Sequence, residues 1–266
     1  MELQRSCGCC LTIAGSDSGG NAGVQADLRV FHDYRLHGCT VFAALTAQNP
    51  FGVAAIHELP SSFVGEQLRA VLGTYDIKAM KTGMLANAET IERVAQELRG
   101  YGAIKKVIDP VMVATSGARL ISEAAIETLK RELLPIATII TPNLPEARAL
   151  CGKESGEARE LSEELSQRFG TAVLVKGGHS QGASAVDVLY DGNEAHEFAL
   201  EWIGKPISTH GTGCSLAAAI TAELAQGRAL AEAIAGAKNY VHRAIANSYY
   251  VGKDCGVLGW GGEREG

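Results

Sequence analysis

The amino-acid sequence predicts an α/β protein built on a mostly parallel central sheet. Short apolar runs recur along nearly the whole chain of 266 residues, and most are continuous rather than alternating with polar residues. Continuous runs are typical of strands that are covered on both faces, as in a parallel sheet. Segments with helical periodicity separate the runs, and this alternation predicts a doubly wound architecture.

The expected strands are six apolar runs, at residues 10–15, 39–45, 77–81, 106–109, 137–141 and 172–176. The expected helices lie between and after them. Their apolar faces are Ile91, Val94, Ala95 and Leu98; Ile126, Leu129 and Leu133; and Leu230, Ile234, Ala237, Val241 and Ile245. Ser122 is the expected N-cap of the second of these helices, because its hydroxyl can accept from a free backbone N–H.

A single domain, 1–266, fits the organisation of the chain best. No linker, charge run or internal repeat interrupts the pattern. The irregular ends, 1–9 and 253–266, are expected to be mobile. In open α/β sheets ligands bind beyond the carboxyl ends of the strands, so the informative residues should follow the apolar runs.

Composition excludes several classes of protein. The hydrophobic fraction is 46%, which excludes an intrinsically disordered chain. The net charge is −6 and no basic block is present, so nucleic acid and anionic membranes are not expected partners. No apolar stretch reaches 18 residues, and no secretory signal is apparent. We therefore expect a cytoplasmic protein with reduced thiols.

The CGCC run at Cys7, Cys9 and Cys10 invites interpretation as a metal site. It lacks a second pair of Cys or His residues at ligand spacing, so we do not predict a metal there. Cys10 is instead expected to begin a strand.

The strongest local signal is His210-Gly211-Thr212-Gly213-Cys214, directly before an Ala-rich helix. Two glycines before a helix start can point several N–H groups at one spot and make an anion site. Cys214 at the first turn should have a lowered pKa, and it could act as base or nucleophile. An ordinary Gly-rich helix entry and a small buried Cys remain the alternatives.

A second signal is the Gly-rich loop 14–23, which leads from a strand into a helix. Asp17 or Asp27 could hydrogen-bond a ligand there. The alternative is a turn with Asp as a cap. Asp27 falls inside the helix, where a short acid is a poor helix former, and this mildly favours a functional role.

Further polar residues follow other strands. Asn143 and Glu146 match a capping box, while Glu146 could also hold Mg²⁺ through water. Asp109 closes an apolar strand, and Lys176 could neutralise a phosphate or snorkel at a strand end. Gln48 could pair with a heterocycle edge or belong to a turn before Pro50. Met84 would flank a ring or belong to the core. An anion site, two carboxylates and a lysine at the strand ends are together what phosphoryl transfer requires.

Seven segments resemble the motifs of one family in its order. They are AGSDSGGNAGVQADLR at 14–29, TAQN at 46–49, KTGML at 81–85, DPVMVATSG at 109–117, TPNLPEA at 141–147, KGGH at 176–179 and THGTGCS at 209–215. The chain resembles the bacterial hydroxymethylpyrimidine/phosphomethylpyrimidine kinases of thiamine biosynthesis, a ribokinase-like family. The resemblance runs from about residue 11 to residue 246.

This resemblance implies a three-layer α-β-α fold without a separate lid domain. It implies ATP-dependent phosphorylation of 4-amino-5-hydroxymethyl-2-methylpyrimidine and then of its monophosphate. It also implies ATP and Mg²⁺ as cofactors and, because kinases of this fold are often dimers, a homodimer.

The same resemblance implies the roles of individual residues. Gln48 would bind the pyrimidine edge, and Asp27 would hydrogen-bond polar groups of the substrate. The pocket lining would be Gly15, Met84 and Val111. The anion hole for the γ-phosphate would be Gly211, Thr212, Gly213 and Cys214, with Cys214 where related sugar kinases carry an aspartate base. Asp109 and Glu146 would organise Mg²⁺, largely through water, and Lys176 would lie near the ATP phosphates.

The first loop departs from the family pattern. The family usually has SDPSGGAG, whereas this chain has SDSGGNAG at 16–23. The tail, GVLGWGGEREG, also keeps little of the family's usual ending, so it predicts no adenine contacts. Two alternatives stay open: a pyridoxal kinase of the same fold, and a catalytically silent sensor that binds a pyrimidine or phosphate.

Overall fold

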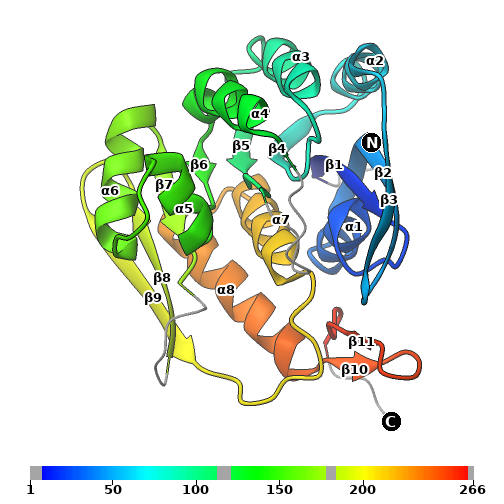
Figure 1. Ribbon diagram of the computed structural model, residues 1–266, viewed down its shortest axis with the longest axis vertical. Helices are drawn as coiled ribbons and strands as arrows, with labels where there is room; N and C mark the ends of the chain where they lie inside the picture. Colours follow the sequence, from blue (N-terminus) through cyan, green and yellow to red (C-terminus); the bar gives the residue numbers. More distant parts are fainter. Residues whose placement is uncertain (1–7, 113–120, 178–183, 263–266) are drawn as a thin grey trace, which may run out of the picture.

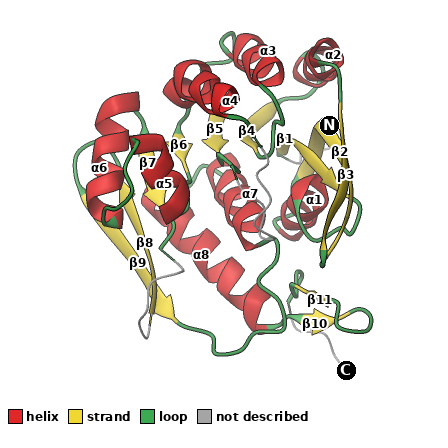
Figure 2. Ribbon diagram, in the orientation of Figure 1, coloured by secondary structure: helices red, strands yellow, loops and turns green. Residues whose placement is uncertain are grey.

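A computed structural model of the chain describes residues 8–112, 121–177 and 184–262. A nine-stranded sheet forms its centre, with the strand order β3-β2-β1-β4-β5-β6-β7-β8-β9 (Figures 1 and 2). The strands are β1 (Cys9–Asp17), β2 (His37–Asn49), β3 (Gly52–Glu58), β4 (Ile77–Thr82), β5 (Lys105–Ile108), β6 (Ile139–Ile140), β7 (Ala172–Val175), β8 (Ser184–Tyr190) and β9 (Ala195–Glu201).

The six strands from β2 to β7 in this order are parallel, while β3, β8 and β9 pair antiparallel at the two sides of the sheet. The six apolar runs expected from the sequence are the parallel strands, so the prediction of a mostly parallel sheet is confirmed. The three antiparallel strands were not predicted, because their sequences are not continuous apolar runs. Strand β9, for example, alternates between half-buried and exposed residues along much of its length, as a strand with one solvated face does.

Helices cover both faces of the sheet. One layer contains α2 (Ser61–Leu72), α3 (Ala88–Leu98), α4 (Glu123–Thr128), α5 (Leu144–Cys151) and α6 (Ala158–Phe169), with a π-turn (Leu129–Leu133) and a 3₁₀ turn (Leu134–Ile136) after α4. The other contains α1 (Gly23–Asp33), α7 (Thr212–Ala225) and α8 (Leu230–Ala246). Each layer has its own apolar core, so the expected three-layer α-β-α fold is confirmed.

Strand β1 shows why both faces of the sheet are apolar. Leu11 and Ile13 pack into the core under α2 and α3, whereas Cys10 packs against the layer of α1, α7 and α8. Successive side chains of a strand point to opposite faces, so a doubly covered strand needs apolar residues at every position.

Local sequence signals at helix starts are reproduced. The Ser122 hydroxyl accepts from the N–H of Ala125, which confirms it as the N-cap of α4. No helix among the described residues has the length and apolar character needed to span a membrane.

Parts of both expected mobile ends belong to strands or core contacts, while residues 1–7 lie outside the described residues. Cys9 is already the first residue of β1. Near the other end, β10 (Tyr249–Tyr250) pairs with β11 (Gly256–Val257), and Leu258 is fully buried. Trp260 is buried and donates from its ring nitrogen to Ser215 of α7. The tail therefore packs against the α1–α7 layer up to residue 262, and 263–266 lie outside the described residues.

Candidate active site

The site residues expected from the sequence gather at the carboxyl ends of the parallel strands. Strands β1, β4, β5 and β7 end there, and α1 and α7, which lie side by side, both begin there (Figure 1). This is the edge at which open α/β sheets bind ligands. Residues 113–117, 178 and 179 of the quoted motifs lie outside the described residues.

Lys176 and Asp109 form an ion pair at the centre of this edge. The Nζ of Lys176 lies 2.9 Å from Oδ1 of Asp109, and Thr141 donates to the same oxygen over 3.3 Å. Asp109 is almost fully buried, but the Lys176 side chain keeps 16% of its surface exposed. Burial alone would lower the pKa of Lys176, yet Asp109 and Glu146 outweigh it and raise the pKa. Lys176 is therefore positively charged at neutral pH, and its side chain is partly exposed.

The expected capping box at Asn143 and Glu146 is confirmed, and Glu146 also binds the loop after β5. Asn143 accepts from the N–H of Glu146, and Glu146 accepts in return from the N–H of Asn143, each over 2.9 Å. The other carboxylate oxygen accepts from the N–H of Met112, which follows Asp109 after β5. Burial raises the pKa of Glu146, while Lys176 opposes the rise. Glu146 thus joins the loops after β5 and β6, and the side chain stays beside Lys176.

Lys81 is a site residue to which the sequence analysis gave no role. It is fully buried at the end of β4 and its Nζ lies 3.0 and 2.9 Å from the two carboxylate oxygens of Asp27. Burial opposes its charge, but Asp27, Cys214 and Asp109 raise its pKa. A lysine at the end of a strand covered on both faces was the available signal, since a buried Lys needs a partner.

The same pair corrects the expectation for Asp27. Asp27 is fully buried, and it accepts from Lys81 and, over 2.6 Å, from the Thr12 hydroxyl. A carboxylate enclosed in this way has no surface to offer a substrate. Its role in this structure is to hold Lys81 beneath the site.

The residues of the expected anion site lie at the N-terminus of α7. Gly211 is the N-cap with φ of 88°, and a Cβ there would lie 1.9 Å from the carbonyl oxygen of Asn21. Only glycine fits that contact. Helix geometry leaves the N–H groups of Gly213 and Cys214 without intrahelical acceptors, and no side-chain cap of α7 is recorded among the described residues. The Thr212 hydroxyl donates to the carbonyl of Thr209 and braces this turn.

Lys176 lies directly beside this helix start. A Cβ built on Gly213 would lie 3.7 Å from the Nζ of Lys176. A positive side chain and the free N–H groups of a helix therefore converge on one spot, as an anion site requires.

The structure corrects the pKa expected for Cys214. Burial raises the pKa of its thiol above the ordinary value of 9.0, and Asp27 and Asp109 add to the rise, while Lys81 and the N–H of Gly23 oppose it. The helix start alone suggested a lowered pKa; the burial around the sulfur outweighs it. The thiol is therefore neutral at pH 7 in the free protein.

The first loop is held by Asp17 and Ser18. Asp17 accepts from the N–H groups of Gly19, Asn21 and Ala22. Burial opposes its ionisation, but the nearby His210 ring and these N–H groups lower its pKa. Asp17 is thus the turn-capping residue of the loop rather than an open ligand group.

Ser18 ties this loop to Gln48. Its hydroxyl donates to the Gln48 carbonyl and accepts from the Gln48 N–H, both over 2.8 Å. Gln48 is half-buried at the end of β2, and its side-chain oxygen accepts from Thr46. The loop that departs from the family pattern is therefore docked on the residue expected to bind the pyrimidine.

The expected pocket lining is brought together in part. A Cβ on Gly15 would lie 2.8 Å from the Cε of Met84, so these two residues are in contact. Val111 lies after β5 with φ of 41°, an unusual conformation for a β-branched residue. Strain of this kind persists where the surroundings enforce it, as at binding sites.

The donor set fits a nucleotide with Mg²⁺. Asp109 and Glu146 supply carboxylate oxygens, which Mg²⁺ prefers, and each carboxylate has lone pairs beyond those its partners use. The Thr82 hydroxyl, at the end of β4, is buried with no hydrogen-bond partner among the described residues. Phosphate oxygens would meet Lys176 and the start of α7.

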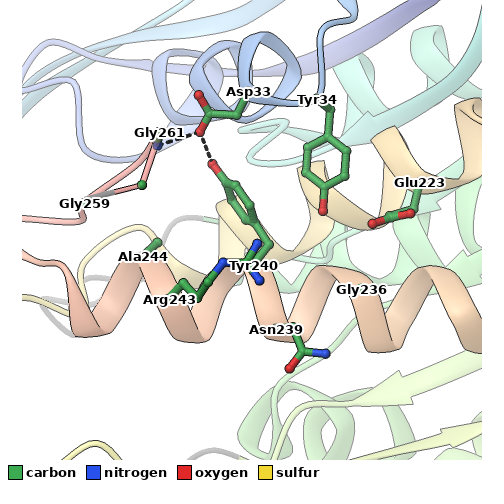
Figure 3. A pocket seen from close by; sticks show the side chains of 11 residues that line it. Asp33, Tyr34, Glu223, Gly236, Asn239, Tyr240, Arg243, Ala244, Gly259 and Gly261 are labelled. Atoms are coloured by element: carbon green, nitrogen blue, oxygen red, sulfur yellow. Dashed lines mark hydrogen bonds between the residues drawn. The ribbon is translucent and has the colours of Figure 1, made fainter. Parts of the chain in front are cut away.

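Two surface hollows lie beside the helices instead. One, of about 600 Å³, is lined by residues of α1, α7, α8 and the tail, where Asp33 accepts from Tyr240 and from the N–H of Gly261 (Figure 3). It lies near the far ends of α1 and α7, about 15 Å from their starts at the site. The second, of about 570 Å³, touches the first loop at Gly19 and Asn21. Neither contains Lys176 or Asp109.

Comparisons with known proteins show similarity to kinases. The sequence profile of the family described as phosphomethylpyrimidine kinase matches residues 17–259. The chain is 46% identical over 241 residues to a hydroxymethylpyrimidine/phosphomethylpyrimidine kinase of Rhizobium meliloti, covering 89% of this chain and 90% of that protein.

Two further relatives differ in length and in name. A thiamine biosynthesis bifunctional protein of Geobacter sulfurreducens is 45% identical over 254 residues, which are 94% of this chain but 52% of that protein. This chain therefore spans about half of that relative. The crystal structure of an ADP complex of Bacillus subtilis pyridoxal kinase superposes with a TM-score of 0.89 at 35% identity, covering 97% of this chain and 98% of that one.

Proposed function

Because the chain belongs to the phosphomethylpyrimidine kinase family, we propose that its site carries out two phosphorylations of thiamine biosynthesis. ATP phosphorylates the hydroxymethyl oxygen of 4-amino-5-hydroxymethyl-2-methylpyrimidine, and a second ATP converts the monophosphate to the diphosphate. The observation that carries the proposal is the convergence of Lys176 with the free N–H groups at the start of α7. The names of the relatives favour this kinase over a pyridoxal kinase and over a silent sensor.

The start of α7 acts on the transferred phosphoryl group. The acceptor oxygen attacks the γ-phosphorus in line, and negative charge spreads over the phosphoryl oxygens. The N–H groups of Gly213 and Cys214 hold that charge, with Lys176 beside them. Removing one such donor typically costs about 2.7–4 kcal/mol of barrier. Gly211 and Thr212 set the turn that aims these groups.

Cys214 contributes through its backbone rather than as a resident thiolate. Its raised pKa leaves little thiolate at neutral pH. A metaphosphate-like transition state needs little help from a base, so the thiol is not required to take the hydroxyl proton. The general-base role expected from the family position is the alternative that substitution tests.

Asp109 and Glu146 hold Mg²⁺ in this proposal, largely through water, and Lys176 neutralises phosphate charge. When bound, Mg²⁺ offsets the charge of the ATP phosphates and fixes their position. The ion pair of Asp109 with Lys176 keeps both groups in place before substrates enter. The hydrogen bond from Met112 to Glu146 keeps the loop after β5 against the site.

The pyrimidine lies against Gly15, Met84 and Val111 in this proposal, with its polar edge on Gln48. An amide offers one donor and one acceptor side by side, as the aminopyrimidine edge does. The two hydrogen bonds between the Ser18 hydroxyl and the Gln48 backbone support this placement, because they fix the position of the residue that would bind the ring.

A homodimer is part of the proposal. The hairpin of β2 and β3 exposes Phe51 and Ile56, at 70% and 42% of their surface, and β3 is an edge strand of the sheet. An apolar edge strand is a ready surface for pairing with a second copy. The cytoplasmic location stays a prediction from the sequence.

A coupled ADP-release assay with Mg-ATP tests the reaction, with products resolved by mass. Hydroxymethylpyrimidine, its monophosphate and pyridoxal are offered separately. Turnover of both pyrimidines, with weak turnover of pyridoxal, is the expected result. Turnover of hydroxymethylpyrimidine or pyridoxal alone would refute the second step, and no turnover of any would refute the proposal. The variant Lys153→Ala, which removes an exposed lysine whose ion-pair partners are Glu160 and Glu164 on α6, is the control for Lys176→Ala.

A further inference from the structure

Three potential metal ligands meet at the edge of the sheet opposite the active site. They are Cys9 at the start of β1 and His37 and Cys39 at the start of β2. One ligand atom from each, two sulfurs and one ring nitrogen, lies within 4.8 Å of the others. Cys39 is buried, Cys9 is half-buried and His37 is exposed, so the cluster opens to solvent on one side.

Strand pairing creates this cluster. β1 and β2 are parallel, with Cys9 opposite His37 and Leu11 opposite Cys39. Residues two apart on a strand face the same side, so His37 and Cys39 share the face of Cys9. The CGCC run lacked a second ligand pair in the sequence nearby; the fold supplies one, His37 and Cys39, from the next strand.

We propose that Cys9, His37 and Cys39 bind a zinc ion. Zinc takes thiolate at about 2.3 Å and imidazole at about 2.0–2.1 Å in tetrahedral geometry, so its ligand atoms lie about 3.5–3.8 Å apart. The three ligand atoms are already within 4.8 Å, and small rotamer shifts complete the geometry. Sulfur and imidazole ligands select zinc over the oxygen-seeking Mg²⁺.

A disulfide fits the same residues less well. Cys9 and Cys39 are diagonal neighbours, because each lies opposite a different residue of the pair of strands. In a parallel pair the strands lie about 4.8 Å apart and a two-residue offset adds about 6.6 Å along the strand, so the two Cα atoms lie about 8 Å apart. A disulfide cannot bridge Cα atoms more than about 7 Å apart. An ion between the sulfurs spans this separation.

The ring of Tyr75 orients the histidine. It stacks on His37 with centroids 5.5 Å apart and an interplanar angle of 17°. Three protein ligands leave the fourth zinc position to water. The active site lies at the other end of β1, which is nine residues long, about 25 Å away. At this distance the ion joins β1 to β2 and takes no part in the proposed phosphorylation.

Zinc titration of the purified, metal-stripped protein tests the site. We expect one zinc per chain by mass spectrometry of the metal, and a Tm about 5–10 °C higher at a zinc concentration hundredfold above Kd. Cobalt substituted for zinc should give the absorption of thiolate-bound, tetrahedral Co²⁺. ADP release from the proposed reaction should not change on zinc removal, so failure of the site and failure of the proposed function remain distinguishable.

Variants of the three residues test whether they are the zinc ligands. His37→Gln and Cys39→Ser should lose the bound zinc and the rise in Tm. His37 is exposed, so His37→Gln should fold even if Cys39→Ser does not. Cys151→Ser is the control for the loss of a thiol, because Cys151 is a half-buried cysteine that lies on α5, outside the cluster. Absence of stoichiometric zinc in the wild-type protein, or undiminished zinc in His37→Gln, would overturn the proposal.

Discussion

Charge at single residues in this protein depends on neighbours that are distant in sequence. Lys81 and Asp27 are 54 positions apart and form a fully buried ion pair. Breaking such a pair by removing one partner typically costs about 3–5 kcal/mol, because a buried charge is left uncompensated. The two partners also act on the Cys214 thiol: Lys81 lowers its pKa and Asp27 raises it. Substitutions of Lys81 are therefore expected to change both stability and the environment of the site.

Cys214→Ala tests the role of the thiol. Because burial raises the pKa of Cys214 and the backbone N–H survives the substitution, we expect kcat to fall by less than about tenfold. The pH dependence of kcat/KM between pH 7 and 9 should be the same in the variant and the wild type. A positioned base is usually worth about 10²–10⁴-fold.

A different outcome would restore the general base. If the wild-type rate rises with pH towards the raised pKa of the thiol, and Cys214→Ala abolishes that rise together with most of kcat, Cys214 takes the proton. Cys255→Ala, which removes another half-buried thiol near the tail, controls for nonspecific effects of losing a cysteine.

At the scale of elements, the start of α7 depends on one backbone conformation. Gly211 has φ of 88° and meets the Asn21 carbonyl of the first loop, so the loop and the helix are fitted to each other. The first loop is in turn docked on β2 through Ser18. Loop, helix start and strand end form one unit, and a change in one moves the others.

Gly211→Ala should disrupt this unit. The added Cβ would overlap the Asn21 carbonyl and displace the N–H groups of Gly213 and Cys214. We expect kcat/KM to fall at least about a hundredfold, the typical effect of losing one such donor. Thermal unfolding and steady-state kinetics measure the two effects.

Gly227→Ala separates the effect of backbone strain at positive φ from the effect of steric overlap with a neighbour. Gly227 has φ of 84° but nothing within 4 Å of an added Cβ, and it lies beyond the far end of α7. We expect it to cost about 1–2 kcal/mol of stability with activity preserved. Equal losses of activity in the two variants would show that the Asn21 contact is unimportant.

At the scale of the whole molecule, the sheet has two different edge strands. β9 lies at one edge and the apolar hairpin of β2 and β3 at the other. The hairpin also carries Gln48, so an interface on it would lie next to the substrate pocket. Assembly and substrate binding would then be linked.

Ile56→Glu tests this assembly. Ile56 is 42% exposed on the edge strand, so a charge there should fold normally and repel a second copy. We expect sedimentation to show a dimer for the wild type and a shift to monomer for the variant. Tyr101→Glu, at an exposed position distant in sequence from the hairpin, should stay dimeric. A wild-type monomer would contradict the proposed homodimer.

The sequence by itself determined the parallel strands, the position of the site at their carboxyl ends, and the capping box at Glu146. These follow from local patterns, because doubly covered strands must be apolar at every position and helix caps need particular side chains. It did not reveal β3, β8 and β9, whose short sequences, GVAAIHE, SAVDVLY and AHEFALE, mix apolar with polar residues instead of forming continuous apolar runs.

Only the tertiary structure decided the chemical state of the site. It paired Lys81 with Asp27, removed Asp27 from the substrate side, and placed the half-buried Cys214 where desolvation raises the pKa of its thiol. It also joined Cys9 to His37 and Cys39. The reason is physical: burial and electrostatic interaction depend on which distant segments become neighbours, and pairing between strands sets that.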